Sequence, residues 1–392
     1  MTSDETPDQT ADQTTGQTAP PVPSVPSAPA IQLDLDGDLV ALFRAVCDVP
    51  SVSGDEKALA DAIETALRPL AHLDVVRDGN AIVARTHLGR SRRVVIAGHI
   101  DTVPLTDPPN LPTRLVGEGA QAEIWGRGTV DMLGGVAIQL ALAASLTAPT
   151  QDVTWVFYDL EEVAADLNGL GRLARNHPEL LQGDFAILGE PTAAGIEGGC
   201  NGTLRVEVRV PGITAHSARA WMGSNAIHSA SVVLDRLAAY EPASIEVEGL
   251  VYREGMNAVG IRGGIAGNVI PDECVVTVNY RFAPSRSLPD AEAHVRDLFS
   301  GFEVVVTDAA PGARPGLDDP LAADFAATVL ELTGGAPAPK YGWTDVARFA
   351  EMGIPAVNFG PGDPVLAHKD DERCPVGHLA LCHDALRAWL TR

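Results

Sequence analysis

The stretch RVVIAGHIDTVP, residues 93–104, joins a short apolar run to a group of polar side chains. Residues 93–97 predict a buried strand of a parallel sheet, because such strands are apolar on both faces. Further apolar runs and helical patterns alternate on either side of it: runs at 153–158 and 185–188, and helical patterns at 39–47, 56–67 and 134–146. This alternation predicts an α/β fold with a mixed, mostly parallel sheet flanked by helices.

The pattern changes near residue 203, where apolar and polar residues begin to alternate. A small α+β unit with an antiparallel sheet is predicted there: strands at 204–210 and near 245–250, 256–261, 275–282 and 302–306, and helices near 225–239 and 290–298. After the Gly- and Pro-rich stretch 310–316, helix and strand patterns resume at 321–332, 345–352, 354–359 and 379–390. We therefore predict four segments: a disordered tail at 1–32, a catalytic domain at 33–202 and 313–392, and an inserted domain at 203–312.

The charge and the composition exclude several classes of function. The chain has 392 residues, and 52 acidic against 28 basic residues give a formal net charge of −24. This charge disfavours binding to nucleic acid or to an anionic membrane surface, and no apolar run is long enough for a spanning helix. Residues 1–32 contain no Lys or Arg and do not resemble a secretion signal. Five widely spaced cysteines predict reduced thiols and a cytoplasmic location: Cys47, Cys200, Cys274, Cys374 and Cys382.

Polar side chains follow each predicted parallel strand, where the active sites of open α/β sheets lie. The candidates are His99 and Asp101 after the first strand, Glu161 and Glu162 after the second, Glu190 after the third, Asp131 between the first two, and His368 late in the chain. Imidazole and carboxylate groups without a thiolate suit Zn²⁺, Co²⁺ or Mn²⁺. More than four ligands, with one shareable carboxylate, indicate two ions. Each feature alone has a structural alternative, since Asp131 could cap a helix and the two glutamates could form a solvated turn.

Five short motifs together are characteristic of one enzyme family: HIDTVP (99–104), GRGTVDM (126–132), EE (161–162), GEPT (189–192) and AHSA (215–218). They resemble the di-zinc exopeptidase and deacylase family, which includes acetylornithine deacetylases, aminoacylases and carboxypeptidase G-type enzymes. The resemblance extends over about residues 35–392. It implies that the inserted domain is ferredoxin-like and acts as a lid and dimerisation domain.

The resemblance also implies a ligand set for two zinc ions, with cobalt as a possible substitute. Asp131 would bridge both ions. His99 and Glu190 would complete the coordination of one ion, and Glu162 and His368 that of the other. The resemblance therefore implies a metal-binding role for each of these five candidate residues.

Three catalytic roles follow from the same resemblance. Glu161 would be the general base that activates the water between the ions, and Asp101 would orient His99. His216, in the inserted domain, would reach the active site of the partner subunit in a homodimer. No nucleic-acid or membrane partner is implied.

Segments on the substrate side resemble one branch of the family: residues 189–217, 267–285, 342–349 and 367–372. That branch removes succinate from N-succinyl-LL-2,6-diaminopimelate in the biosynthesis of diaminopimelate and lysine. Asn268, Arg281 and Arg348 match positions that hold the substrate. The alternative substrate is acetylornithine or another N-acyl amino acid, cleaved by a deacylase or carboxypeptidase.

The sequence differs from the family pattern at two places, and one other class of function is an alternative to this interpretation. Leu133 replaces a lysine that relatives often carry, and Leu160 separates Asp159 from the glutamate pair. A metal-free relative that acts as a binding or scaffold protein is the other class. Such relatives typically lose a metal ligand or the general base. This chain keeps all of the residues proposed for these roles: His99, Asp131, Glu161, Glu162, Glu190 and His368.

Overall fold

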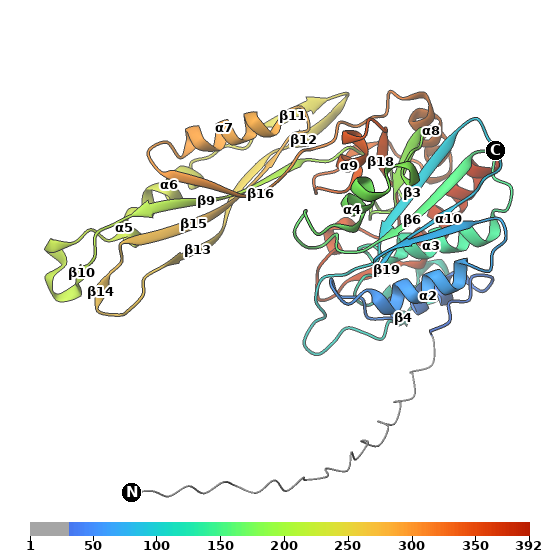
Figure 1. The fold of residues 1–392 in the computed structure, drawn as a ribbon, viewed down its shortest axis with the longest axis horizontal. Helices are drawn as coiled ribbons and strands as arrows, with labels where there is room; N and C mark the ends of the chain where they lie inside the picture. The colour runs from blue at the N-terminus through green and yellow to red at the C-terminus, as the bar shows by residue number, and fades with distance from the viewer. Residues whose placement is uncertain (1–30) are drawn as a thin grey trace, which may run out of the picture. The chain divides into compact units, whose positions relative to one another are not determined.

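The computed structural model describes residues 31–392, which form one compact unit. The predicted disordered tail therefore lies outside the described residues, except for its last two positions. Within the described range, no helix is both long enough and apolar enough to cross a bilayer. Two larger sheets, of eight and four strands, and three small ones make up the β-structure of this range (Figure 1).

An eight-stranded mixed sheet forms the larger layer. Its order is β1 (Asp74–Asp78), β2 (Ala81–Arg85), β6 (Asp152–Tyr158), β3 (Arg93–His99), β7 (Phe185–Leu188), β18 (Ala356–Asn358), β8 (Glu197–Gly198) and β17 (Ala338–Pro339). The four central strands β6, β3, β7 and β18 are parallel, and β8 pairs parallel with β17. The remaining neighbours are antiparallel. The predicted α/β class with a mixed, mostly parallel sheet is confirmed.

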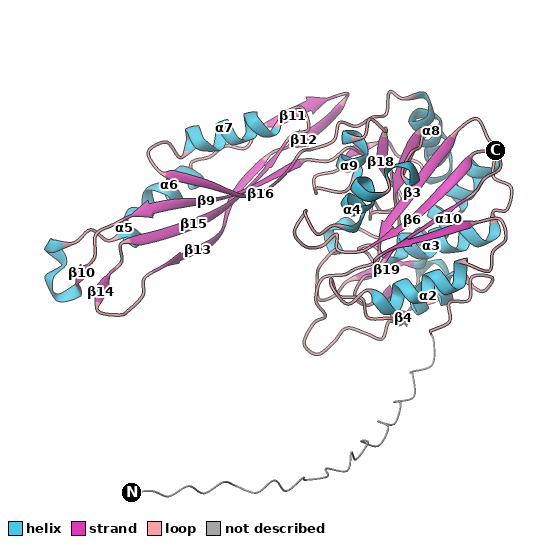
Figure 2. Ribbon diagram, in the orientation of Figure 1, coloured by secondary structure: helices cyan, strands magenta, loops and turns pink. Residues whose placement is uncertain are grey.

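Alternate residues of the central strands face two separate cores, because successive side chains point to opposite faces of a sheet. Val94 and Ile96 of β3 belong to the first core, and Val95 and Ala97 belong to the second. The first core is covered by α1 (Leu39–Cys47), α2 (Lys57–Leu67), α3 (Leu133–Ser145), α8 (Pro320–Thr333) and α10 (Val376–Thr391). The second is covered by α4 (Gly169–Asn176) and α9 (Val346–Glu351). Helices thus flank both faces of the sheet (Figure 2), which explains the unbroken apolar runs.

The second sheet is antiparallel and has the order β13 (Gly255–Gly263), β15 (Glu273–Phe282), β9 (Gly202–Pro211) and β16 (Glu303–Ala310). One of its faces packs against α5 (Ala226–Ser229), α6 (Ser231–Ala238) and α7 (Leu288–Leu298). Its strands all lie between the two halves of the larger sheet in the sequence. The exact boundaries proposed for the inserted domain stay a prediction.

Two sequence predictions in this region were wrong. The helix expected at 225–239 is divided into α5 and α6 around Ala230. The strand expected at 245–250 is a hairpin of β11 (Ser244–Val247) and β12 (Leu250–Arg253). Its turn residues Glu248 and Gly249 both have positive φ, the backbone conformation of a tight hairpin turn.

Short strands complete the fold. A three-stranded sheet contains β4 (Arg114–Val116), β5 (Glu123–Trp125) and β19 (Arg373–Pro375), and a separate ribbon pairs β10 (Ala215–His216) with β14 (Val269–Ile270). The sequence patterns did not predict these strands, nor β1, β2, β8 and β17. Strands of two to five residues contain too few positions to show a periodic pattern.

Candidate metal centre and active site

The carboxyl ends of three neighbouring parallel strands bring the predicted ligands together. His99 is the last residue of β3, Glu161 and Glu162 follow β6, and Glu190 follows β7. Because these strands are adjacent and parallel, their ends lie at one edge of the sheet. Two further ligands reach this edge from loops: Asp131, just before α3, and His368, after the turn 364–366.

Five residues form two groups that share Asp131. Ligand atoms of His99, Asp131 and Glu190 all lie within 4.8 Å of one another, as do those of Asp131, Glu162 and His368. His99 Nε2 is 3.0 Å from Asp131 Oδ1, and His368 Nε2 is 3.2 Å from Asp131 Oδ2. The two oxygens of Asp131 therefore face different groups, which is the arrangement that a bridging carboxylate needs.

The donor set fits divalent ions of the zinc type. Each group offers imidazole and carboxylate atoms from three residues, which leaves room for water or substrate. Glu190 Oε1 is buried, and no described residue offers it a hydrogen bond. Burial, together with the charge of Asp131, raises the pKa of Glu190 to about 8. A cation between these carboxylates would stabilise their charged forms.

Asp101 connects His99 to the turn that carries the two glutamates. Its Oδ1 accepts the backbone N–H of Glu161 at 3.0 Å, and its Oδ2 accepts that of Glu162 at 3.1 Å. The His99 ring contacts Asp101 twice: Nδ1 is 3.0 Å from its carbonyl oxygen and 3.5 Å from Oδ1. Burial alone would raise the pKa of Asp101, but His99 and the backbone donors outweigh it and hold this pKa below its usual range. Asp101 thus contacts both the proposed ligand His99 and the glutamate turn, which is the placement that an orienting carboxylate needs.

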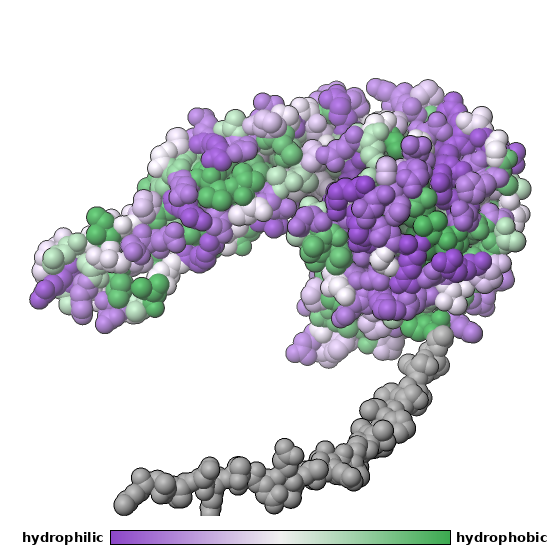
Figure 3. Space-filling model, in the orientation of Figure 1, coloured by the Kyte–Doolittle hydropathy of each residue, from purple (hydrophilic) through white to green (hydrophobic). Residues whose placement is uncertain are grey.

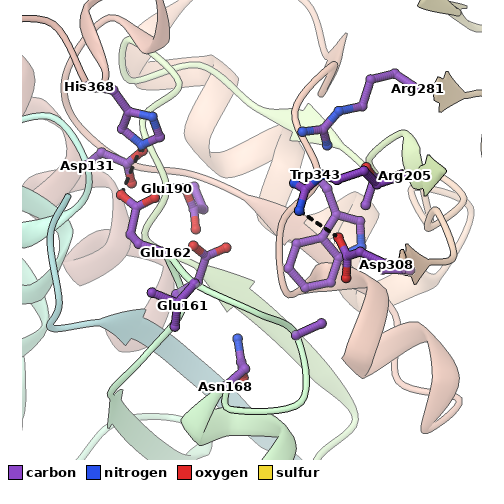
Figure 4. A pocket seen from close by; sticks show the side chains of 14 residues that line it. Asp131, Glu161, Glu162, Asn168, Glu190, Arg205, Arg281, Asp308, Trp343 and His368 are labelled. Carbon is purple, nitrogen blue, oxygen red and sulfur yellow. Dashed lines mark hydrogen bonds and ion pairs between the residues drawn. The ribbon is translucent and has the colours of Figure 1, made fainter. Parts of the chain in front are cut away.

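Glu161 lies in the cavity beside the ligands. This cavity has a volume of about 230 Å³, and Glu161, Glu162, Glu190, Asp131 and His368 line one side of it (Figure 4). Burial raises the pKa of Glu161 well above its ordinary value, although the charge of His99 opposes this shift. A carboxylate with a raised pKa is a better proton acceptor, which suits a general base.

The structure keeps His216 and Asn268 away from this cavity within one chain. Both are exposed side chains on or beside the ribbon of β10 and β14, and neither lines the cavity. They are close to each other along the backbone, since the Ser217 N–H donates to the Asn268 carbonyl at 2.9 Å. Their catalytic and substrate-binding roles stay predictions that require a second chain.

The two predicted substrate arginines differ in their surroundings. Arg281 lines the cavity, and its Nε donates to Asn279 Oδ1 at 3.1 Å. No carboxylate of the described residues forms an ion pair with it. Arg348 is instead bound to Asp345, with Nε 2.5 Å from Oδ1, and to the carbonyl oxygen of Ala165. Arg348 does not line the cavity, so its contact with substrate stays a prediction.

A sequence model of Peptidase family M20/M25/M40 matches residues 95–392. The chain belongs to this family. A protein of Mycobacterium tuberculosis named putative succinyl-diaminopimelate desuccinylase DapE is 53% identical over 361 residues, covering 91% of this chain and 99% of that protein. A succinyl-diaminopimelate desuccinylase of Corynebacterium glutamicum is 46% identical over 369 residues, covering 92% and 98%. A tripeptidase structure from Staphylococcus aureus superposes with a TM-score of 0.74 at 19% identity, covering 91% and 98%, and thus has the same fold. The family resemblance inferred from the motifs is confirmed.

A buried ion pair beside the centre of this M20/M25/M40 chain was missed by the sequence analysis. Arg127 Nη1 donates to Glu372 Oε2 at 2.9 Å and to the carbonyl oxygen of Lys369 at 3.2 Å. Glu372 Oε1 accepts the backbone N–H groups of Val130, at 2.8 Å, and Asp131, at 3.3 Å. The pair therefore ties the backbone of Asp131, a proposed ligand, to the loop that follows His368. Both residues lie in quoted motifs, but nothing in the sequence indicates that they pair.

We expect Glu372→Gln to weaken metal binding. The substitution keeps the size of the side chain but removes the charge opposite Arg127, so the Asp131 backbone loses part of its support. Loss of such an outer partner typically lowers metal affinity by about 10- to 100-fold. Calorimetric titration of the metal-free protein with Zn²⁺ measures this change.

A neighbouring carboxylate provides the control for this experiment. Asp371→Asn removes the charge of an exposed side chain whose one ion-pair partner among the described residues is Arg373, and it should leave the affinity unchanged. Melting curves of the metal-free variants show whether each one is folded. Wild-type affinity in a folded Glu372→Gln protein would contradict the supporting role of Glu372.

Proposed function

We propose that this chain hydrolyses N-succinyl-LL-2,6-diaminopimelate to succinate and LL-2,6-diaminopimelate. The observation that carries this proposal is the 53% and 46% identity to two named desuccinylases over nearly their whole length. All five proposed ligands and the proposed base are present, and the ligands converge at one sheet edge. The proposed compartment is the cytoplasm, which the five free and buried cysteines support.

The proposed cofactor is a pair of Zn²⁺ ions, with Co²⁺ as a substitute. His99, Asp131 and Glu190 would hold one ion, and Asp131, Glu162 and His368 the other, as the two groups of ligand atoms suggest. Bound ions of this kind supply Lewis-acid polarisation of the amide carbonyl and activation of water.

Glu161 would move the proton in this reaction. Its carboxylate would take a proton from the attacking water, and the water oxygen would bond to the amide carbonyl carbon. The same carboxyl group would pass the proton to the nitrogen as the C–N bond breaks. The second proton of the water stays on the new carboxylic acid and then passes to the released amine, so that a carboxylate and an ammonium leave the site. The hydrogen bond from the Glu161 backbone to Asp101 holds this side chain at the sheet edge.

Arg281 would bind a carboxylate of the substrate. Its Nη atoms have no carboxylate partner among the described residues, and Asn279 anchors its Nε. Burial lowers the pKa of Arg281, yet a guanidinium stays charged at neutral pH. In a chain of net charge −24, such a local cation is needed to attract a substrate that carries three carboxylates.

The proposed assembly is a homodimer formed through the inserted elements, with His216 and Asn268 entering the partner's cavity. The outer strand β13 has a free edge and exposes Val259 and Ile261, which are 59% and 56% accessible. Helix α6 exposes Val232 and Leu234. Figure 3 shows apolar side chains at the surface over this part of the chain. Such a patch and a free strand edge are features of an interface.

A substrate comparison tests the proposed activity. We expect the zinc-loaded protein to hydrolyse N-succinyl-LL-2,6-diaminopimelate with a kcat/KM at least about tenfold above that for Nα-acetylornithine, because a site that binds several carboxylates disfavours a substrate with only one. Loss of amide absorbance in the ultraviolet measures both rates. A preference for the acetyl substrate would assign the chain to another deacylase branch. Failure to bind metal or cleave either amide would favour a scaffold protein.

A further inference from the structure

Across the cavity from the proposed metal ligands lies one face of the antiparallel sheet, the face opposite its helices. Along β9, Leu204, Val206 and Val208 pack into the core of the inserted elements, so the alternate residues point to the other face. Arg205 is one of these, and it lines the cavity together with Asp308, Arg281 and Trp343. In Figure 4 these four labelled side chains lie across the cavity from Glu161, Glu190 and His368.

A β-bulge places an acid beside Arg205. The register of β16 against β9 shifts between Val306 and Asp308, so that Thr307 is the extra residue and Asp308 stands directly opposite Arg205. Directly opposed residues of neighbouring strands share a face, and bulges commonly re-aim a side chain near an active site. Without the bulge, Thr307 would occupy this position. The sheet thus presents a cation and an anion side by side to the cavity.

This pair is available to a ligand. The closest approach of the two groups is 3.8 Å, from Arg205 Nη1 to Asp308 Oδ2, which is longer than a hydrogen bond. Their side chains are 49% and 27% exposed. Each group therefore keeps hydrogen-bonding capacity that its neighbour does not use.

We propose that Arg205 and Asp308 form a binding site for a zwitterionic α-amino acid group, with the guanidinium holding the carboxylate and the carboxylate of Asp308 holding the ammonium. The inference rests on the proposed function, and it names the part of the substrate that this side of the cavity takes. The free end of N-succinyl-LL-2,6-diaminopimelate is such a group. An N-acylated ornithine or lysine ends in an ammonium alone, so the site distinguishes these substrates by the missing carboxylate.

Two truncated substrates separate the contributions of the two residues. Nα-succinyl-L-lysine lacks the distal carboxylate, and Nα-succinyl-L-2-aminopimelate lacks the distal ammonium. Arg205→Met should lower kcat/KM for the full substrate by roughly 10- to 100-fold, the usual effect of losing a hydrogen bond to a charged group. With the lysine compound its loss should be at least about tenfold smaller. Asp308→Asn should show the converse pattern, with its smaller loss on the aminopimelate compound.

The same two strands provide a matched control pair outside the cavity. Arg209 of β9 stands opposite Glu303 of β16, and neither lines the cavity. Arg209→Met and Glu303→Gln should both keep kcat/KM for all three substrates within about twofold of the wild-type value. Melting temperatures of all four variants show that each is folded.

The outcomes distinguish this inference from the proposed function. Equal losses by Arg205→Met on all three substrates, or no loss at all, would overturn the zwitterion site while wild-type desuccinylation still stands. A wild-type enzyme without activity on the full substrate would overturn the proposed function and this inference with it. The crossed pattern of losses supports both.

Discussion

Glu161→Gln is expected to abolish most of the turnover while leaving the metal in place. Glutamine keeps the shape of the side chain and the backbone hydrogen bond to Asp101, but it cannot accept the proton of water. We expect kcat to fall by at least about a hundredfold, since general-base catalysis typically contributes that much or more. Steady-state kinetics and metal analysis of the same preparation measure both quantities.

The adjacent glutamate is the matched comparison. Glu162 approaches His368 at 2.9 Å and belongs to a proposed ligand group, so Glu162→Gln should lose metal as well as activity. The two neighbours thus have different expected signatures, although each substitution removes one charge. Near-normal turnover by Glu161→Gln, or loss of its metal, would contradict its assignment as the base.

Mixing two inactive variants should restore activity if His216 acts in the partner's site. In that site the His216 imidazole would donate a hydrogen bond to the oxyanion that forms when water attacks the amide. Loss of one such donor typically lowers kcat by about 10²- to 10³-fold, and we expect a loss of this size for His216→Ala. In a mixed dimer with Glu161→Gln, one site has both an intact Glu161 and an intact His216 from the other chain. Random pairing should then return roughly a quarter of wild-type activity.

The mixture requires its own control and a measurement of mass. Co-expression of Glu161→Gln with Asp131→Asn should restore nothing, because both changes disable the site of their own chain. Sedimentation should show a dimer for every protein. A monomer, or mixed dimers that stay as inactive as their parents, would contradict the proposed role of His216.

Several parts of the fold could be predicted because their signal is local. The strands β3, β6 and β7 are continuous apolar runs buried on both faces, and the predicted helix at 39–47 matches α1. The hairpin of β11 and β12 could not be recognised in the same way. Its two strands have four residues each, and the turn at Glu248 interrupts what resembles one strand of alternating apolar and polar residues.

The candidate ligands were also predictable, because chemistry at strand ends can be inferred before the strands are assembled. His99, Glu162 and Glu190 each follow an apolar run directly or within a few residues. Their partners in the structure were not predictable to the same degree. Arg127 and Glu372 are 245 positions apart, and no pattern along the chain relates them.

By itself the amino-acid sequence determined which residues we propose to carry the chemistry, since metal ligands and an acid–base group need particular side chains at the ends of buried strands. The tertiary structure alone decided how they are arranged in space. Strand register and a one-residue bulge place Asp308 beside Arg205. The folding of the chain also brings Glu372 to the backbone N–H of Asp131. Such pairings depend on distances between remote segments, and these exist only once the sheets have formed.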